Sequence, residues 1–131
     1  MIFRISLADR PVTSNVNEEL QWLGGSLGLF GIRDKDKSCF RIFIELVKHA
    51  RANEQVSSDD LAERLQLTRG TVIHHINKLM EAKIVIVQHN RYVLRESSLS
   101  ALIAHLREDV NDRLLELQEI AKDLDKKLEL K

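Results

Sequence analysis

Apolar residues recur at helical intervals along most of the chain, which predicts a mainly α-helical fold. Residues 39–51 form one such segment, and Ile42 and Leu46 give it a second apolar side. A helix that is apolar on two sides must be covered twice, which we expect from the N-terminal segment or from a partner subunit. Ser38 precedes the segment and is a candidate N-cap.

Two shorter helices follow, separated by a two-residue turn. Ser57 begins a Ser-x-x-Asp pattern that approximates a capping box, and the helix after it should end near Gln66. Thr68 opens the second helix, which should run to about Ala82. Its buried stripe, at positions i, i+4 and i+7, consists of Val72, Ile76 and Leu79.

A small β-hairpin is predicted directly after these helices. Residues 84–87 are a β-branched run, residues 88–91 a tight turn and residues 92–94 a return strand. A helix, a helix-turn-helix pair and a β-hairpin in this order are typical of a winged helix-turn-helix.

The chain from Ser98 onward predicts one long helix of roughly 45 Å, at ~1.5 Å per residue. Its apolar residues lie three or four positions apart from Leu99 to Leu128, with one stutter near Val110, and such a narrow seam is typical of a coiled coil. A seam of this length needs a partner helix, so we predict a homodimer. The predicted dimerisation residues are Ile103, Leu106, Val110, Leu114, Leu117, Leu124 and Leu128.

The N-terminal residues predict an extension made of a strand and a helix. Residues 2–7 alternate in part and should form a short strand, and Ser14 or Asn15 can cap a short helix through Trp22 or Leu23. The 131 residues therefore divide into the extension (residues 1–37), a winged domain (residues 38–96) and a dimerisation helix (residues 97–131).

The middle of the chain resembles a known family of DNA-binding domains. Residues 61–79 read LAERLQLTRGTVIHHINKL, which is similar to the core of the arsenic-repressor-like (ArsR-like) and MarR-like regulators. The resemblance covers about residues 40–96. It implies a transcription regulator with the helix over residues 69–82 in the major groove and the wing over residues 84–95 on the backbone or minor groove. Lys83 departs from the family, which usually has a glycine there in a left-handed conformation that lysine adopts at modest strain.

The net charge of zero hides a segregation that favours nucleic acid. Residues 68–95 carry five basic side chains and one acidic one, a balance of +4, whereas residues 97–131 carry six basic and eight acidic ones, a balance of −2. The local field steers a ligand more than the total charge does. The five basic side chains are those of Arg69, Lys78, Lys83, Arg91 and Arg95.

The second helix of the pair supplies the candidate DNA-binding residues. A helix that begins at Thr68 points unpaired N–H groups outward, which suits a phosphate. The other candidates are Arg69, His74 and Asn77 for base edges, Thr71 and Lys78 for phosphates, Ile73 for a thymine methyl group, and Arg91 at the hairpin tip for the backbone or the adjacent minor groove.

A different class of function stays open. Winged helices also serve as protein-binding modules, and this chain would then dock in a larger assembly through its C-terminal helix. The modest balance of +4 and the apolar Ile73 at an exposed position are compatible with that alternative.

Metal binding is not supported by the sequence. His74 and His75 diverge by about 100° on a helix and cannot chelate one ion together, and His75 is expected to pack beside the core. His105 and Asp109 are an i, i+4 pair, which is usually solvated. Cys39 is the single cysteine, whereas metal-sensing ArsR-like relatives often use paired cysteines near the short helix. We expect no metal and no cofactor.

Two apolar features have a structural and a functional interpretation. Cys39 is interpreted as a small core residue, and Lys37 and Arg41 give only a faint hint of a redox-sensitive thiol. A small-molecule effector stays open, although the residues that could line its pocket are interpreted as core packing; they are Trp22, Leu27, Leu29 and Phe30.

The sequence does not favour an enzyme or a membrane protein. Residues 24–28 lack the Lys-Ser/Thr of a phosphate-binding loop, and no Ser-His-Asp or paired-carboxylate motif stands at a recognisable spacing. No stretch of 18 uncharged apolar residues is present, and no basic head precedes the apolar stretch at residues 20–32. We expect a soluble cytoplasmic protein that is not an enzyme.

Overall fold

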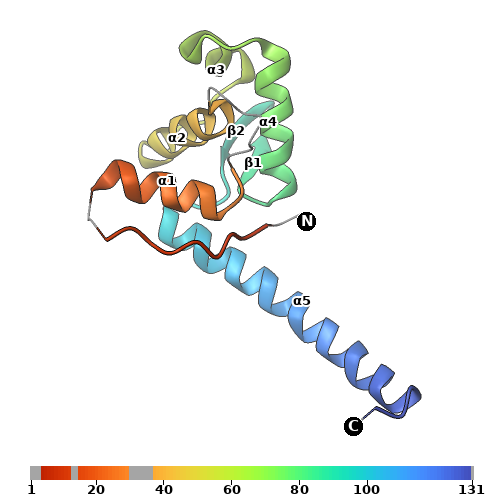
Figure 1. The fold of residues 1–131 in the computed structure, drawn as a ribbon. Coiled ribbons are helices and arrows are strands. Elements are labelled where there is room, and N and C mark those ends of the chain that lie inside the picture. Colours follow the sequence, from red (N-terminus) through yellow and green to blue (C-terminus); the bar gives the residue numbers. More distant parts are fainter. Residues whose placement is uncertain (1–3, 13–14, 30–36, 131) are drawn as a thin grey trace.

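A computed structural model describes residues 4–12, 15–29 and 37–130. These residues form five helices and one two-stranded antiparallel hairpin, and the last helix projects far beyond the rest (Figure 1). The fold is therefore a winged helix followed by a long helix, as predicted. The elements are α1 Val16–Ser26, α2 Ser38–Arg51, α3 Ser58–Leu65, α4 Arg69–Glu81, β1 Val85–Gln88, β2 Arg91–Leu94 and α5 Leu99–Lys127.

Polar caps fix where most of the helices begin. Each cap side chain accepts a hydrogen bond at 3.1 Å from the N–H group three residues further on; the caps are Asn15, Ser57, Thr68 and Ser98. The prediction for Ser38 is wrong by one position. Ser38 is the first residue of α2 and is buried, and the N-cap is Lys37, whose φ of 54° is left-handed.

The core is centred on α2. Ile42 and Leu46 are almost completely buried, which confirms the second apolar side of the helix, whereas Phe40, Ile44 and Val47 of the first side are only half-buried. The buried stripe predicted for α4 is also confirmed. The core includes Leu27 and Leu29 after α1 and Leu102 and Leu106 of α5, so it contains residues on both sides of the predicted domain boundaries.

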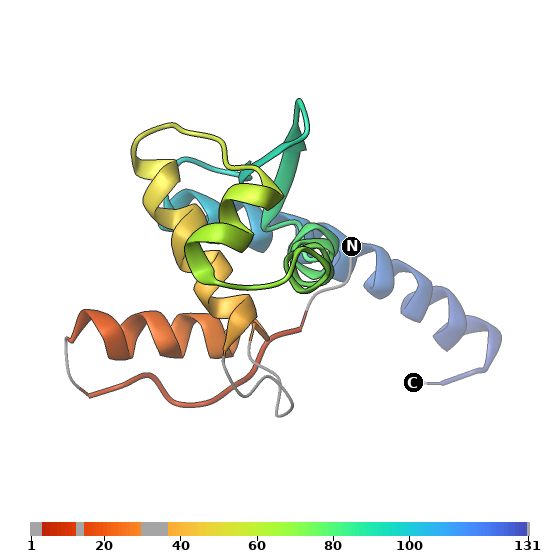
Figure 2. The ribbon, with the colours of Figure 1, turned by 90° about the horizontal axis from the view of Figure 1, so that it is seen from above.

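The predicted strand over residues 2–7 is wrong for the part that the structure describes. Residues 4–12 have no helix or strand and run beside α1 (Figures 1 and 2). The Ser6 N–H donates to the Ser26 carbonyl at 2.9 Å, while Ile5 and Leu7 are exposed. A short alternation does not make a strand without a neighbouring strand to receive its hydrogen bonds. The helix of the extension is confirmed and is longer than predicted, reaching Ser26.

The hairpin is confirmed, with its tip at His89 and Asn90. Both residues have positive φ, 53° and 63°, which is typical of the two-residue type I′ turn between antiparallel strands. Val56 adds a bridge to β2: its N–H donates to the Tyr92 carbonyl at 2.9 Å and its carbonyl accepts from the Tyr92 N–H at 2.7 Å. The loop before α3 is therefore fastened to the wing.

The turn between α4 and the wing shows how the chain accommodates a lysine at position 83, where the resembling family usually has glycine. Lys83 has a φ of 61°, the left-handed conformation for which the resembling family usually has glycine. The Lys83 N–H donates to the Met80 carbonyl and the Ile84 N–H to the Leu79 carbonyl, both at 3.0 Å. These bonds close the end of α4 despite the missing glycine.

Helix α5 has a packed half and a projecting half. Leu102 and Leu106 are buried, Ile103 packs against the core, and every residue from 111 to 130 is exposed. Two of the predicted dimerisation residues, Ile103 and Leu106, therefore contribute to the core of their own chain, which corrects that prediction. The sequence pattern could not show this difference, because the same apolar spacing continues through the packed half and the projecting half of the helix.

Cys39 lies in the core and is 4% exposed. We expect Cys39→Ala to lower the free energy of unfolding by about 1 kcal/mol, since it removes one buried sulfur atom. Chemical denaturation measures this change. Affinity for duplex DNA in the presence of peroxide should be the same for the parent and the variant; a peroxide response that only the parent shows would contradict a purely structural role.

An ion pair and a hydrogen bond to a histidine fasten α5 to the base of the wing. Arg95 Nη1 lies 2.6 Å from Asp109 Oδ2, and His105 Nδ1 lies 2.7 Å from Glu96 Oε1. The hydrogen bond from the Arg95 guanidinium lowers the pKa of the Asp109 carboxyl below its usual range. His105 and Asp109 thus have separate partners in the base of the wing.

The lowered pKa of Asp109 predicts a pH-dependent contribution to stability. A depressed pKa in the folded state stabilises the fold at pH values above about 4, and the contribution is lost as the pH falls through the folded value. We expect Asp109→Asn to cost about 1 kcal/mol at pH 7 and progressively less below pH 4. Urea unfolding at pH 7 and at pH 3 tests this, with the exposed Asp123→Asn as a control. An equal loss of unfolding free energy at the two pH values would contradict the prediction.

Candidate nucleic-acid interface

Helix α4 presents a polar face opposite its buried stripe. His74, Asn77 and Lys78 are exposed, and Thr71 and Ile73 are half-buried. The structure therefore gathers seven of the eight candidates on α4 and its cap. The middle of this face follows the spacing i, i+4, i+7 through Gly70, His74 and Asn77.

The start of α4 is organised by Thr68 and Thr71. Thr68 Oγ1 accepts from the Thr71 N–H at 3.1 Å, and its hydroxyl donates to Thr71 Oγ1 at 2.8 Å. Because Thr71 Oγ1 accepts this bond, its own proton points elsewhere and suits an acceptor outside the chain, such as a phosphate oxygen.

Arg69 has a neighbour that the sequence did not reveal. Its Nε lies 3.7 Å from Asp59 Oδ1 of α3, and both side chains are largely exposed. An exposed pair at this distance contributes little to stability, so Arg69 can exchange this carboxylate for a ligand at low cost.

Gly70 is a feature of the site that the sequence reasoning missed. Among the described residues, a Cβ atom at this position would meet no atom within 4 Å apart from its chain neighbours and the backbone of its own helix. The fold therefore does not require glycine there, and the first turn of α4 is left open in the middle of its exposed face. A glycine in the first turn of a helix, where residues with better helix propensity are available, was the signal in the sequence.

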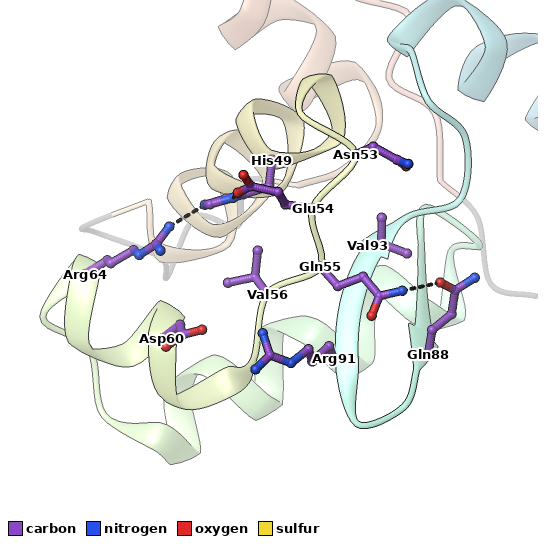
Figure 3. A pocket seen from close by; sticks show the side chains of 10 residues that line it. All are labelled: His49, Asn53, Glu54, Gln55, Val56, Asp60, Arg64, Gln88, Arg91 and Val93. Atoms are coloured by element: carbon purple, nitrogen blue, oxygen red, sulfur yellow. Dashed lines mark hydrogen bonds and ion pairs between the residues drawn. The ribbon is translucent and has the colours of Figure 1, made fainter.

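Arg91 is the first residue of β2, so its predicted place at the tip is corrected by one position: the tip is His89 and Asn90. Figure 3 shows Arg91 extending toward α3, where it lines a hollow of about 640 Å³ together with Asp60 and Arg64. Arg91 therefore lies between the wing and the start of α3. His89 and Asn90, both exposed, were not among the candidate residues.

Polar contacts brace the other sides of this hollow (Figure 3). Gln55 Nε2 donates to Gln88 Oε1 at 2.6 Å, which links the loop before α3 to the wing. His49 Nδ1 lies 2.9 Å from Glu54 Oε2, and Arg64 donates to His49 Nε2. These contacts hold α2, α3 and the wing in a fixed arrangement around Arg91.

The positive surface is smaller than the sequence balance suggested. Arg95 is paired with Asp109 and is only 15% exposed, so its charge is offset within the chain. Lys83 lies at the opposite end of α4 from Thr68. The cations available to a ligand on α4 and the wing are therefore Arg69, Lys78 and Arg91.

The histidines match their structural interpretation. His75 is 8% exposed, as expected of a packed histidine, and its ring centroid lies 5.2 Å from that of His74 at an interplanar angle of 61°. Within the described ranges, no three His, Cys, Asp or Glu side chains gather in a way that could hold a metal ion.

The apolar residues considered for an effector pocket separate into two places. Leu27 and Leu29 are buried in the core, and Phe30 lies outside the described residues. Trp22 is half-buried, donates from Nε1 to the Ala8 carbonyl at 3.0 Å, and lines a groove of about 370 Å³ with Leu99. In the part of the chain that the structure describes, no helix combines the length and apolarity needed to cross a bilayer.

Comparison with known proteins agrees with this geometry. Residues 40–86 match the family model described as winged helix-turn-helix DNA-binding, a match that spans α2, α3 and α4 and reaches into β1. Neither the curated proteins nor the solved structures gave a match. Residues 40–86 are thus similar to a winged helix-turn-helix DNA-binding domain, and the fold of the described residues agrees with that similarity.

Proposed function

We propose that this protein is a sequence-specific transcription regulator that binds double-stranded DNA as a homodimer. The observation that carries the proposal is the exposed polar face of α4 within a domain that matches the winged helix-turn-helix DNA-binding family. The resemblance to ArsR-like and MarR-like regulators belongs to this proposal, as does a cytoplasmic location, since DNA is the proposed ligand. The proposed activity is binding, not catalysis.

In the proposed complex, α4 lies in the major groove. Asn77 and His74, near the middle of the exposed face, read base edges together with Arg69, and Ile73 contacts a thymine methyl group. The open start of α4 and Lys78 face phosphates. Arg91, between the wing and α3, contacts the backbone or the adjacent minor groove.

The proposed dimer forms through the projecting half of α5. Four leucines of the predicted seam are between 46% and 62% exposed there, which leaves an apolar stripe without cover in one chain. A second copy of the same helix covers such a stripe. Steps of four and three residues without interruption connect Val110, Leu114, Leu117, Ala121, Leu124 and Leu128.

Selection of bound sequences from a random duplex library tests the proposal. We expect enrichment of two half-sites related by two-fold symmetry and separated by about one helical turn, because two recognition helices of a symmetric dimer reach adjacent major grooves. Recovery of no enriched sequence by the full chain would contradict sequence-specific binding.

Substitutions of Asn77 and of Arg91 should affect different properties of DNA binding, base selectivity in the first case and overall affinity in the second. We expect Asn77→Ala to cost about 1–3 kcal/mol at one base position and to relax selectivity there. Arg91→Ala should weaken binding to all duplexes equally and lower the salt slope by about one unit. Titration of matched and mismatched duplexes at several salt concentrations measures both; identical effects of the two variants would contradict the assigned roles.

One observation favours a second candidate function. Leu115 and Ile120 are 51% and 60% exposed and lie outside the seam, Leu115 about 100° round the helix from Leu114, so the apolar surface of the projecting helix is not confined to the stripe that two paired helices cover. This favours a winged-helix module that docks on another protein through α5. Recovery of one specific partner by the full chain, without affinity for any duplex, would support that alternative.

A further inference from the structure

We propose that Arg95 is a positioning residue that fixes the angle between α5 and the recognition helix α4. This proposal rests on the proposed dimeric regulator, in which the angle determines the separation of the two recognition helices. Arg95 would thereby set the spacing of half-sites that the dimer accepts, without contacting DNA.

Arg95 contacts the end of α4 and the side of α5 at once. Its backbone N–H donates to the Ile84 carbonyl at 2.9 Å, and its Nη1 donates to the Lys83 carbonyl at 3.4 Å. The same Nη1 donates to Asp109 Oδ2 at 2.6 Å. Lys83 is the left-handed residue that follows α4, so one guanidinium group connects the end of the recognition helix to α5.

The contact lies where α5 leaves the domain. Leu102 and Leu106 hold the helix earlier by apolar packing, which is strong but has little directional preference. Beyond Val110 every residue to Leu130 is exposed, so Arg95–Asp109 is the last ion pair between the described core and α5. A charge-assisted hydrogen bond at this point restricts the direction of the helix more sharply than packing does.

The contact between His105 and Glu96 cannot replace the Arg95–Asp109 ion pair. His105–Glu96 lies one turn nearer the core, and its side chains are more exposed, at 39% and 32%, than those of Arg95 and Asp109, at 15% and 27%. A contact nearer the core restricts the direction of the projecting half of α5 less than a contact nearer the point where α5 leaves the core. Arg95–Asp109 is therefore the contact with the larger influence on the angle.

Because the projecting half of α5 is long, a small change in its tilt displaces its end by more than the distance between successive base pairs. From Asp109 to Lys127 the helix continues for about 27 Å, so a tilt of about 10° displaces its end by about 5 Å. If the paired ends are fixed, the same tilt moves the recognition helices instead. Successive base pairs are about 3.4 Å apart, so this displacement is larger than one step of half-site spacing.

The test measures spacing selectivity with Asp109→Asn, which keeps the size of the side chain and weakens its bond to Arg95. Asp123→Asn is the matched control, because Asp123 forms an exposed pair with Lys127 on the same helix. Full-length proteins are titrated with duplexes whose two half-sites are separated by different numbers of base pairs. We expect the parent and Asp123→Asn to prefer one spacing, and Asp109→Asn to lose this preference several-fold while keeping its affinity for a single half-site. Unchanged selectivity in a folded Asp109→Asn would overturn the proposal.

A second measurement separates this proposal from the proposed function. Spin labels at Glu63→Cys and Glu119→Cys, in a Cys39→Ala chain diluted with unlabelled protein, report the distance between α3 and the projecting half of α5. We expect a narrow distance distribution for the parent and for Asp123→Asn, and a broad one for Asp109→Asn and for Arg95→Met. Equal widths would overturn the role of Arg95 even if the parent binds DNA. A parent without any preferred spacing would instead contradict the proposed dimeric regulator.

Discussion

Replacing both Leu117 and Leu124 by glutamate is expected to convert a dimeric protein into a monomer. The two side chains are 56% and 46% exposed in the single chain, so the substitution leaves the core intact. In the proposed dimer each chain would bury both leucines, at about 1.5–3 kcal/mol each, and glutamates there would be desolvated and would repel one another. Affinity for a duplex with two half-sites should fall by about two orders of magnitude or more, because a monomer that binds one half-site no longer holds a second DNA-binding domain near the other half-site.

Sedimentation of the full chain at micromolar concentration measures the change. The parent should show twice the mass of one chain, and the double variant the mass of one chain. Leu115→Glu is the matched control, since Leu115 is 51% exposed on the same helix but lies outside the seam. A monomeric parent would contradict the dimer, and a Leu115→Glu variant that dissociates equally would contradict pairing through the seam.

Removing the three available cations together, as Arg69, Lys78 and Arg91 to alanine, should abolish most of the affinity for DNA. Lys78 and Arg91 are assigned to the DNA backbone, and each such contact contributes about 0.9 to the salt slope, so the two contribute about 1.8, which corresponds to about thirtyfold in affinity at ~0.15 M salt. Loss of the base contact of Arg69 removes a further ~1–3 kcal/mol at one base position. The fold should be unaffected because all three side chains are exposed. Titration of random duplex at several salt concentrations gives both the affinity and the slope.

A control with the same change of net charge shows whether the position of the cations matters. Arg51, Lys122 and Lys126 are exposed and lie outside α4 and the wing. Their replacement by alanine should leave the salt slope nearly unchanged. If the first triple variant binds like the parent, or if both variants lose the same affinity, the DNA-binding face has been misplaced.

The elements of the winged domain could be predicted from the sequence because periodicity and capping agree there. Thr68 is followed by apolar residues at helical spacing, and both its capping bond and the buried stripe of α4 are present. The hairpin was predictable because a β-branched run meets a turn that tolerates positive φ, and Asn90 accepts that conformation. These signals are local, so a single sequence contains them in full.

What could not be predicted depends on contacts between distant residues. The alternation at residues 2–7 gave no information on whether a neighbouring strand exists, and none accompanies the described residues 4–7. Leu102 was missed because it lies outside the seam, although it is completely buried. Neither the pairing of Arg95 with Asp109 nor that of Arg69 with Asp59 has a sequence signature, because each joins residues at least ten positions apart.

The burial of Leu102 and Leu106 also changes where the chain can be cut. The seam alone suggests that a chain ending at Ser98 keeps a folded winged domain. Such a chain would lack two fully buried leucines, each of which contributes about 2–5 kcal/mol to a core. Only a boundary beyond Val110 leaves the core of the winged domain complete.

The open glycine at position 70 sets two requirements on the protein against each other. A glycine within a helix costs about 0.5–1 kcal/mol relative to alanine, and none of the described residues would obstruct the extra methyl group. The same methyl group would stand in the middle of the surface that is proposed to approach DNA. Selection for thermal stability alone would therefore favour alanine at position 70. A library of variants screened without DNA would accumulate this substitution, although it alters the proposed DNA-binding surface.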